Sequence, residues 1–340
     1  MVVEKVLVTG SSGFIGMHLC RDLLNDGYIV KGIDNMNNYY SLSLKKARLK
    51  KLLSNHNFTF SEIDITNPRR VEKVFNEFKP DMVVNLAAQA GVRYSIENPL
   101  KCINTNIVGF TNIIQSCLQY NVGGLIYASS SSVYGGNEKI PFSTDDRVDK
   151  PISIYAASKK SNELMAHSYS NLYKLPTTGL RFFTVYGPWG RPDMALFKFT
   201  DSIFKDKPIE VFNNGNMVRD FTFIDDIVEG LKRVIDKTPN SDKQFNHKNP
   251  KLGSSWAPYK IFNIGNSNPT PLMDYINSIE KAIGKKAKIN FKPMQMGDVQ
   301  CTSANTKALE EWIDFKPNTS IDVGISKFIA WYRDFYSCSK

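Results

Sequence analysis

Residues Val6–Gly16 read V-L-V-T-G-S-S-G-F-I-G, a short β-branched run followed at once by glycine-rich residues. From Phe14 to Asn25 the apolar spacing is that of a helix. The glycines of this stretch therefore lie between a strand and a helix. Gly10 suits a tight turn, Gly13 lets the backbone approach a pyrophosphate, and Gly16 lets helix and strand pack closely. Free N–H groups at the helix N-terminus can bind phosphates through hydrogen bonds. The stretch predicts a dinucleotide-binding unit, with an ordinary glycine turn as the alternative.

An acidic residue, Asp34, ends the next strand-like run, Tyr28–Ile33. A carboxylate at that position can accept hydrogen bonds from the ribose hydroxyls of adenosine. Its charge repels a 2′-phosphate, which favours NAD over NADP. The alternative interpretation is a turn aspartate, because Asn35 and Asn37 are turn-forming neighbours.

Strand-like and helix-like segments alternate through the first half of the chain. This alternation indicates βαβ units and a parallel sheet covered on both faces. We expect an α/β fold with a Rossmann-type, doubly wound parallel sheet in residues 1–185, to which some later segments return. The predicted strands are Val6–Thr9, Tyr28–Ile33, Phe58–Ile63, Met82–Ala87, Gly124–Ala128 and Thr177–Phe183, and the predicted helices are Phe14–Asn25, Pro68–Phe78, Leu100–Tyr120 and Ile154–Tyr173.

The pattern changes after about Tyr186, where glycines and prolines mark a loop. Shorter mixed segments follow, so we expect residues 186–340 to form mainly a smaller C-terminal lobe that binds the substrate. The polar stretch Pro239–Pro258 is expected to be a surface loop. The predicted elements of the lobe are Asp220–Ile224, Ile261–Ile264, Pro271–Ile283 and Ile321–Tyr336.

Composition narrows the class of protein. Hydrophobic residues make up 42% of the chain, as in ordinary globular proteins. No run approaches the roughly 18 apolar residues of a membrane span, and the N-terminus lacks a signal-peptide pattern. We therefore expect a cytoplasmic protein that does not associate with membranes. Five scattered cysteines and four histidines show no metal-ligand spacing, so we expect neither a disulfide framework nor a metal site.

The formal net charge is +10. A basic protein can bind nucleic acid, anionic lipid or acidic small molecules. The densest basic run, Lys45–Lys51, is interpreted as the solvated face of a helix, and no nucleic-acid-binding motif accompanies it. Acidic small molecules such as nucleotide diphosphates are the expected partners, rather than nucleic acid.

Two further motifs carry chemistry. Tyr155 and Lys159 stand four residues apart near the start of a predicted helix, so their side chains share one face. An ammonium group nearby favours the phenolate form of a tyrosine, which can remove a proton from a sugar hydroxyl. Alone, such a pair is most often a surface coincidence. Serines 129–132 follow a predicted strand, where open α/β sheets bind ligands. A serine-rich turn is the alternative there.

Together these motifs resemble the extended short-chain dehydrogenase/reductase family, in the same order and spacing over nearly the whole chain. The resemblance implies a Rossmann domain, a small C-terminal substrate lobe, tightly held NAD and reversible hydride transfer at a sugar carbon. Within the family the chain is most similar to UDP-glucuronate 4-epimerases. The stretches that carry this similarity are Asn35–Tyr40, Ala88–Ser95 and Tyr186–Ala195.

The resemblance also implies the roles of individual residues. Thr184 and Arg191 are expected beside the substrate carboxylate, and Arg219 and Asp298 at the uridine-diphosphate end. The expected catalytic residues are Tyr155, Lys159 and Ser130. The expected NAD-binding residues are Gly10, Gly13, Phe14, Ile15, Gly16, Asp34, Asn35, Asp64, Ile65, Ala87, Ala88, Gln89, Asn104 or Asn106, Tyr155 and Lys159. The expected substrate-binding residues are Arg93, Ser130, Ser131, Tyr155, Thr184, Arg191, Arg219 and Asp298.

Related dehydratases carry Asp-Glu, and related decarboxylases a Glu, at the positions of Ser131 and Ser132. Elimination of water needs an acid or base there, so we expect simple inversion at C4. The predicted reaction interconverts UDP-glucuronate and UDP-galacturonate by oxidation, rotation of the 4-keto sugar and reduction. Arg191 is expected to grip the substrate carboxylate, with a surface loop charge as its alternative. We expect a homodimer and a role in polysaccharide biosynthesis.

Other functions stay open at this point. The same machinery serves 4-epimerases of UDP-N-acetylglucosamine or UDP-glucose. Non-catalytic NAD binding and salt-dependent binding to nucleic acid or membrane surfaces are the alternatives from other classes. Two departures from the family pattern lie in the substrate lobe, where the nucleotide contacts are expected. Met296 replaces a proline of the family's Gln-Pro-Gly-Asp segment, and Pro239–Pro258 matches nothing in the family.

Overall fold

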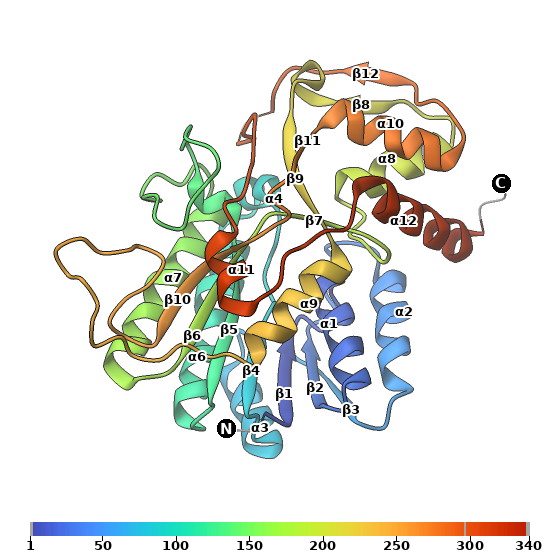
Figure 1. The fold of residues 1–340 in the computed structure, drawn as a ribbon. Helices are drawn as coiled ribbons and strands as arrows, with labels where there is room; N and C mark the ends of the chain where they lie inside the picture. Colours follow the sequence, from blue (N-terminus) through green and yellow to red (C-terminus); the bar gives the residue numbers. More distant parts are fainter. Residues whose placement is uncertain (1–2, 296, 338–340) are drawn as a thin grey trace.

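The centre of the molecule is a parallel sheet of seven strands with helices on both faces, seen in a computed structural model that describes residues 3–295 and 297–337 (Figure 1). The strands of this sheet are β1 (Lys5–Thr9), β2 (Ile29–Asp34), β3 (Phe58–Glu62), β4 (Met82–Asn85), β5 (Gly124–Ser130), β6 (Thr177–Phe182) and β10 (Tyr259–Ile264). Their order is β10-β6-β5-β4-β1-β2-β3, and every pairing is parallel. This is the doubly wound order of dinucleotide-binding folds, in which the strand order reverses between β1 and β4. The predicted fold class is confirmed.

Two helical layers cover the sheet. One contains α1 (Phe14–Asn25), α2 (Leu42–Leu53), α9 (Ile224–Ile235) and α11 (Lys307–Ile313), and the other contains α3 (Pro68–Phe78), α6 (Phe110–Gln119) and α7 (Ile154–Tyr173). Between α3 and α7 the chain also forms α4 (Val92–Glu97), α5 (Pro99–Ile103), a π-helical turn η1 (Asn104–Gly109) and a 3₁₀ turn η2 (Ser131–Tyr134). A separate hydrophobic cluster lies under each layer. Because both faces are covered, nearly every residue of the central strands β1, β4, β5 and β6 is buried.

The remaining elements form a smaller lobe, at the upper right of Figure 1. Its strands are β7 (Thr184–Tyr186), β9 (Val218–Phe223) and β11 (Pro269–Pro271) in one sheet, and β8 (Ile209–Val211) with β12 (Ile289–Phe291) in another. Its helical segments are α8 (Ala195–Phe204), η3 (Phe212–Gly215), α10 (Leu272–Ile283) and α12 (Ile321–Tyr336).

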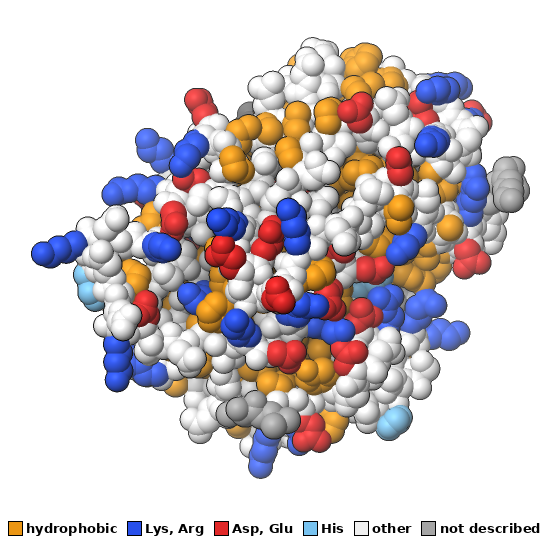
Figure 2. All heavy atoms as spheres, in the orientation of Figure 1, with side chains coloured by type: hydrophobic (Ala, Val, Ile, Leu, Met, Phe, Trp, Pro, Cys, Tyr) orange, Lys and Arg blue, Asp and Glu red, His pale blue; other side chains and the backbone are white. Residues whose placement is uncertain are grey.

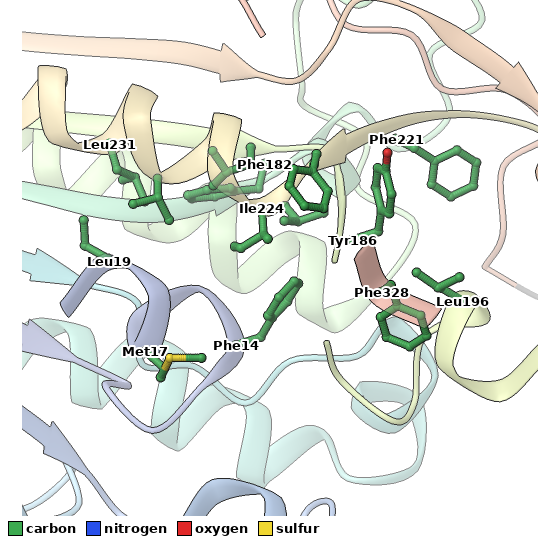
Figure 3. Packing of buried hydrophobic residues seen from close by; sticks show 14 of the residues in the cluster. Phe14, Met17, Leu19, Phe182, Tyr186, Leu196, Phe221, Ile224, Leu231 and Phe328 are labelled. Carbon is green, nitrogen blue, oxygen red and sulfur yellow. The ribbon is translucent and has the colours of Figure 1, made fainter. Parts of the chain in front are cut away.

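One hydrophobic core joins the lobe to the sheet. Figure 3 shows Phe14 of α1 near Ile224 of α9, with Tyr186 and Phe221 beyond them toward the lobe. The Phe221 ring stacks on Tyr275 of α10, with the ring centroids 3.9 Å apart. Buried aromatic pairs of this kind add to the stability of a packed core. The core therefore fixes the lobe beside the carboxyl edge of the sheet.

Helix α7 begins at a side-chain cap. Ser153 Oγ accepts a hydrogen bond from the Ala156 N–H at 3.1 Å, which satisfies one of the free donors of the first turn. The helix ends at Lys174 in the left-handed conformation. The cap fixes the first turn of α7, and Tyr155 lies in that turn.

Some predicted elements differ in the structure. The single helix predicted over Leu100–Tyr120 is instead α5, η1 and α6 in series. The strand predicted over Asp220–Ile224 ends at Phe223, because α9 starts at Ile224. Residues Tyr259–Ile264 return to the main sheet beside β6. Residues 239–258 contain neither helix nor strand, as a surface loop requires.

The interpretation of the basic run was wrong for two of its residues. In α2, Lys46, Lys50 and Lys51 are exposed, but Lys45 and Arg48 are buried. They share the inner face of the helix with Leu44 and Leu52, so the helix buries charge as well as apolar surface.

Candidate active site

A cavity of about 400 Å³ lies at the carboxyl ends of the sheet strands. It extends from the glycine-rich loop after β1 to the loop after β7, so it lies between the sheet and the smaller lobe. Open α/β sheets bind ligands at this edge. Predicted site residues that line it are Gly10, Gly13, Phe14, Ile15, Gly16, Asp34, Asn35, Ile65, Ala87, Ala88, Gln89, Ser130, Ser131, Tyr155, Lys159, Thr184 and Arg191.

The glycine-rich loop has no room for side chains. Gly10 has a φ of +69°, a conformation that favours glycine. A Cβ at Gly16 would lie 2.2 Å from the carbonyl oxygen of Gly10, and one at Gly13 would lie 2.9 Å from it. The backbone thus turns tightly onto the start of α1, whose N–H groups are then available to phosphates. This geometry fits the pyrophosphate of a dinucleotide.

Asp34 fixes the end of β2 beside this loop. One carboxylate oxygen accepts from the Ser12 N–H at 3.1 Å and the other from the Met36 N–H at 2.9 Å. The ammonium of Lys45 lies 4.0 Å from the same carboxylate and also lines the cavity. Each carboxylate oxygen can accept a further hydrogen bond, so the ribose hydroxyls of an adenosine fit here.

Of the two residues expected to contact adenine, one lines the cavity and the other does not. Ile65 lines the cavity, whereas Asp64 does not. Asp64 accepts hydrogen bonds from Asn35 Nδ2 at 2.8 Å and from the Thr66 N–H at 2.9 Å. Burial opposes its charge, but these hydrogen bonds hold the pKa of Asp64 below its usual value. In this structure Asp64 orients Asn35, which does line the cavity.

The π-helical turn η1 places neither Asn104 nor Asn106 in the cavity lining, but Asn106 supports the cavity wall. Asn104 is exposed and does not line the cavity, while Thr105 does. Asn106 is buried, and its side chain bonds both backbone groups of Gln89. Its Oδ1 accepts from the Gln89 N–H at 2.8 Å, and its Nδ2 donates to the Gln89 carbonyl at 3.1 Å and to Ser158 Oγ at 3.0 Å. Asn106 therefore links the cavity wall to α7.

Tyr155, Lys159 and Ser130 meet in the cavity. The Lys159 Nζ lies 5.9 Å from the centre of the Tyr155 ring and donates to the Ala128 carbonyl at 2.7 Å. Burial lowers the pKa of Lys159 to about 8. Burial also raises the pKa of Tyr155, while the charge of Arg191 and a hydrogen bond with Ser130 act in the opposite direction. The site thus holds a phenol beside cations and a hydroxyl, as proton transfer requires.

A buried ion pair supports the serine run from below. Ser129 Oγ donates to Glu163 Oε1 at 2.7 Å, and Arg181 grips both oxygens of Glu163 at 2.8 and 2.9 Å. Burial opposes the charge, but Arg181 holds the pKa of Glu163 below its usual value. The hydroxyl proton of Ser129 is therefore used within this network.

Arg191 enters the cavity from the loop after β7. Thr184 and Ser131 line the same cavity. The Arg191 guanidinium pairs with Asp193, through Nε to Oδ1 at 3.0 Å and through Nη2 to Oδ2. A hydrogen bond also holds the loop in place, because His18 Nε2 donates to the Pro188 carbonyl at 3.0 Å.

The remaining predicted substrate residues form a second group outside the cavity lining. Arg93 of α4 pairs with Asp298 at 3.2 Å. Arg219 of β9 donates to the carbonyls of Val299 and Gln300 at 2.6 and 3.0 Å. The departure at Met296 lies outside the described residues. Asp298 also interacts with the charge of Arg219, so these three side chains share one region, outside the cavity lining.

The model of the NAD dependent epimerase/dehydratase family matches residues 6–265. The chain belongs to this family. Its cofactor is therefore NAD, which the glycine-rich loop and Asp34 fit. Over the described residues, no group of three or more His, Cys, Asp or Glu side chains could hold a metal ion.

Relatives and a solved structure agree with this membership. "Protein CapI" from Staphylococcus aureus is 55% identical over 98% of this chain and 99% of that protein. A "Probable UDP-glucuronate 4-epimerase" from Rhizobium meliloti is 44% identical over 98% of both chains. The crystal structure of a Bacillus cereus UDP-glucuronic acid 4-epimerase, in complex with UDP-glucuronic acid and NAD, has a TM-score of 0.86 and 32% identity, covering 98% of this chain and all of that one.

The cavity of this family member contains few acids. Among the described residues that line it, the carboxylate side chain is that of Asp34, at the end of β2. Ser131 and Ser132 lie where related dehydratases carry acids, and both line the cavity. Elimination chemistry needs an acid or base at that point, so the lining is suited to inversion without elimination.

Sequence reasoning missed several residues of the site. Lys45 lines the cavity, and Arg48 lies directly behind it, although both stand in a run that reads as a solvated face. Asp193 lies within a motif that carried the family resemblance, yet its pairing with Arg191 was not foreseen. The sequence signal that could have located these residues is a charged side chain at a position where the helix or loop points toward the interior.

Proposed function

We propose that this chain is a UDP-sugar 4-epimerase that interconverts UDP-glucuronate and UDP-galacturonate. The observation that carries the proposal is the entry of Arg191 and Thr184 into the cavity that holds Tyr155, Lys159 and Ser130. An arginine is suited to bind a planar carboxylate through paired N–H groups. Neutral UDP-hexoses offer no such group at C5.

In this proposal Tyr155 accepts the proton of the C4 hydroxyl. Ser130 bridges the two oxygens, and Lys159 favours the phenolate through its positive charge. NAD, when bound, accepts a hydride from C4 and returns it. Between the two transfers the 4-keto sugar turns about its bond to the diphosphate, so that its opposite face meets the cofactor. The acid-free wall around Ser131 and Ser132 supports inversion over elimination.

Arg191 has a second task in the proposal. Oxidation at C4 makes glucuronate a β-keto acid, which loses CO2 when its C5–C6 bond stands perpendicular to the carbonyl plane. Gripping the carboxylate near that plane keeps the bond poorly aligned for cleavage. The grip depends on a fixed guanidinium, and Asp193 already fixes it in this structure.

We assign residues 186–340 mainly to a substrate-binding lobe, and residues 1–185 to the NAD-binding domain with later segments returning. The group formed by Arg93, Arg219 and Asp298 belongs in this proposal to the uridine-diphosphate end. Two cations beside one another suit a diphosphate. The 4-epimerases of UDP-glucose and UDP-N-acetylglucosamine stay as alternatives.

The positive net charge suits binding of acidic small molecules better than binding of nucleic acid. Figure 2 shows basic and acidic side chains interspersed over most of the displayed face, without a continuous basic surface. Nucleic-acid-binding proteins usually cluster their cations on one face. No helix of the described residues is long and apolar enough to cross a membrane.

A homodimer formed through α5, η1 and α7 is part of the proposal. These segments pack together and expose large apolar side chains: Leu100, Val108, Leu164 and Leu172. Large exposed apolar side chains on neighbouring helices are typical of an interface. Sedimentation of the wild type and of Leu164→Glu tests it, and a wild-type monomer would contradict it.

The test of function is product analysis by proton NMR, with UDP-glucuronate, UDP-glucose and UDP-N-acetylglucosamine supplied separately to the NAD-loaded enzyme. We expect UDP-galacturonate from the first at the highest kcat/KM, without net reduction of NAD. Preference for a neutral sugar would keep the 4-epimerase mechanism and overturn the role of Arg191. Inactivity with all three sugars would favour a non-catalytic NAD-binding protein.

A further inference from the structure

Arg191 is not a free cation at the cavity wall. Its Nε–H and one Nη2–H are taken by the two oxygens of Asp193, which grip one edge of the guanidinium. A guanidinium has five N–H donors in one plane. Asp193 leaves both protons of Nη1 and the second proton of Nη2 uncovered, and the Tyr39 hydroxyl also hydrogen-bonds to the guanidinium. These three donors lie on the edges that Asp193 does not cover.

Asp193 is itself held from a second element. Tyr39 donates its hydroxyl proton to Asp193 Oδ2 at 3.2 Å. The Tyr39 ring meets Tyr94 of α4 edge-on, with ring centroids 4.9 Å apart. A Cβ at Gly91 would lie 2.6 Å from the Tyr39 hydroxyl oxygen, so that glycine makes the space for it. Two packed contacts therefore fix Tyr39, which in turn restrains Asp193.

Asp193 balances the positive charge of Arg191, and both side chains stay ionised. Burial opposes the charge of Asp193, yet Arg191 holds the pKa of Asp193 below its usual value. The pair thus carries no net charge near neutral pH. A ligand that meets Arg191 meets directed N–H groups rather than an unpaired positive charge. Recognition by such a group depends on the position of the ligand's oxygens.

We propose that Asp193, restrained by Tyr39, is a positioning residue that makes the enzyme selective for acidic sugars by presenting the uncovered edge of Arg191 to the substrate carboxylate. The inference rests on the proposed function and deepens it. Asp193 does not line the cavity, so it acts through Arg191 and does not touch the sugar.

The test is calorimetric binding of UDP-glucuronate and of UDP-glucose to NAD-loaded protein carrying Asp193→Asn. Asparagine keeps the size of the side chain but loses its charge and one acceptor. We expect the affinity for UDP-glucuronate to fall about tenfold, since the guanidinium loses one of the two charged acceptors that fix its orientation toward the carboxylate. The affinity for UDP-glucose should change less than about twofold. The ratio of the two affinities is the measured quantity, and a general structural defect leaves it unchanged.

Two further variants complete the design. Tyr39→Phe keeps the Arg191–Asp193 pair and removes its restraint, so the ratio should fall in the same direction by a smaller factor. Asp22→Asn breaks a pair with Arg21 on α1, away from the cavity, and should leave the ratio unchanged. An equal loss for both sugars, an unchanged ratio, or tighter binding of UDP-glucuronate by Asp193→Asn would each overturn the proposal. Failure of the proposed function itself is separately visible as wild-type protein that forms no UDP-galacturonate.

Discussion

Arg48 of α2 donates a hydrogen bond from Nη2 to the carbonyl of Trp189 at 2.5 Å, and another to that of Gly190 at 3.1 Å. The same guanidinium donates from Nη1 to the carbonyl of Ser12 at 3.2 Å. Arg48 is fully buried, and backbone carbonyls and the Tyr40 hydroxyl are its hydrogen-bond acceptors. One buried cation therefore ties the loop of Arg191 to the glycine-rich loop.

Replacing Arg48 should loosen this connection. In Arg48→Met, the carbonyls lose their donors while remaining buried, so we expect the free energy of unfolding to fall by about 3 kcal/mol. The KM for the UDP-sugar should rise, because the loop that carries Arg191 loses its anchor. Denaturant unfolding and steady-state kinetics measure the two effects. Lys50→Met, on the exposed side of the same helix, is the control and should change stability by less than about 0.5 kcal/mol. Wild-type stability in Arg48→Met would contradict the anchoring role.

His18 should make the protein sensitive to acid. Burial, together with the charge of Arg21, lowers the pKa of His18 from 6.5 to about 3 in the folded protein. Between these two values the unfolded chain binds a proton that the folded protein does not, so stability falls as pH is lowered. The full effect is on the order of 5 kcal/mol. In His18→Gln, which can still donate to the Pro188 carbonyl, the dependence of unfolding free energy on pH should be flatter in this window. The exposed His56→Gln is the control, and equal slopes in both variants would argue against the assignment.

Asn106 should control cofactor affinity through Gln89. Asn106→Ala leaves both backbone groups of Gln89 without their partner, so the wall of the cofactor site loses its fixed position. We expect the Kd for NAD to rise about tenfold, measured by fluorescence titration. Asn104→Ala, in the same π-helical turn but exposed, should bind NAD as the wild type does. The reverse pattern would favour Asn104 as the cofactor contact.

Local patterns were enough to predict much of the fold. The bounds predicted for α1, α3, α7 and α12 match the structure, because apolar periodicity and capping residues mark helix ends. The π-helical turn was missed, since its apolar spacing is close to that of a regular helix. Gly109 packs there against Ile65, where a Cβ would lie 2.6 Å from the isoleucine side chain. That contact joins positions far apart in the sequence, so it has no local signal.

In the site too, local motifs were predictable from the sequence, whereas contacts between distant positions were not. Motifs within a few residues of one another located the glycine-rich loop, the serine run and the Tyr155–Lys159 pair. Contacts such as that of His18 with the Pro188 carbonyl join residues 170 positions apart. Burial of Arg48 depends on where the Trp189 loop lies.

Removing Arg191 should act on the acidic substrate. We expect Arg191→Ala to lower kcat/KM for UDP-glucuronate by about 100-fold, the loss of two charge-assisted hydrogen bonds. Part of the remaining turnover should release CO2, because the carboxylate is no longer held near the plane of the C4 carbonyl. In that side reaction the C5–C6 bond breaks, its electron pair goes to C5, a proton adds there, and the cofactor stays reduced. Product NMR and the absorbance of reduced nicotinamide measure both. Unchanged epimerisation would rule out the carboxylate role.

The most direct test of the account follows a deuterium label at C4 of UDP-glucuronate in ordinary water. If the C4 hydrogen leaves as a hydride and returns to the opposite face, the UDP-galacturonate formed should retain the deuterium at C4 and gain no solvent hydrogen elsewhere in the ring. Tyr155→Phe should abolish this conversion. Loss of the C4 label to solvent, or full conversion by Tyr155→Phe, would contradict transient oxidation at C4 with Tyr155 as the base.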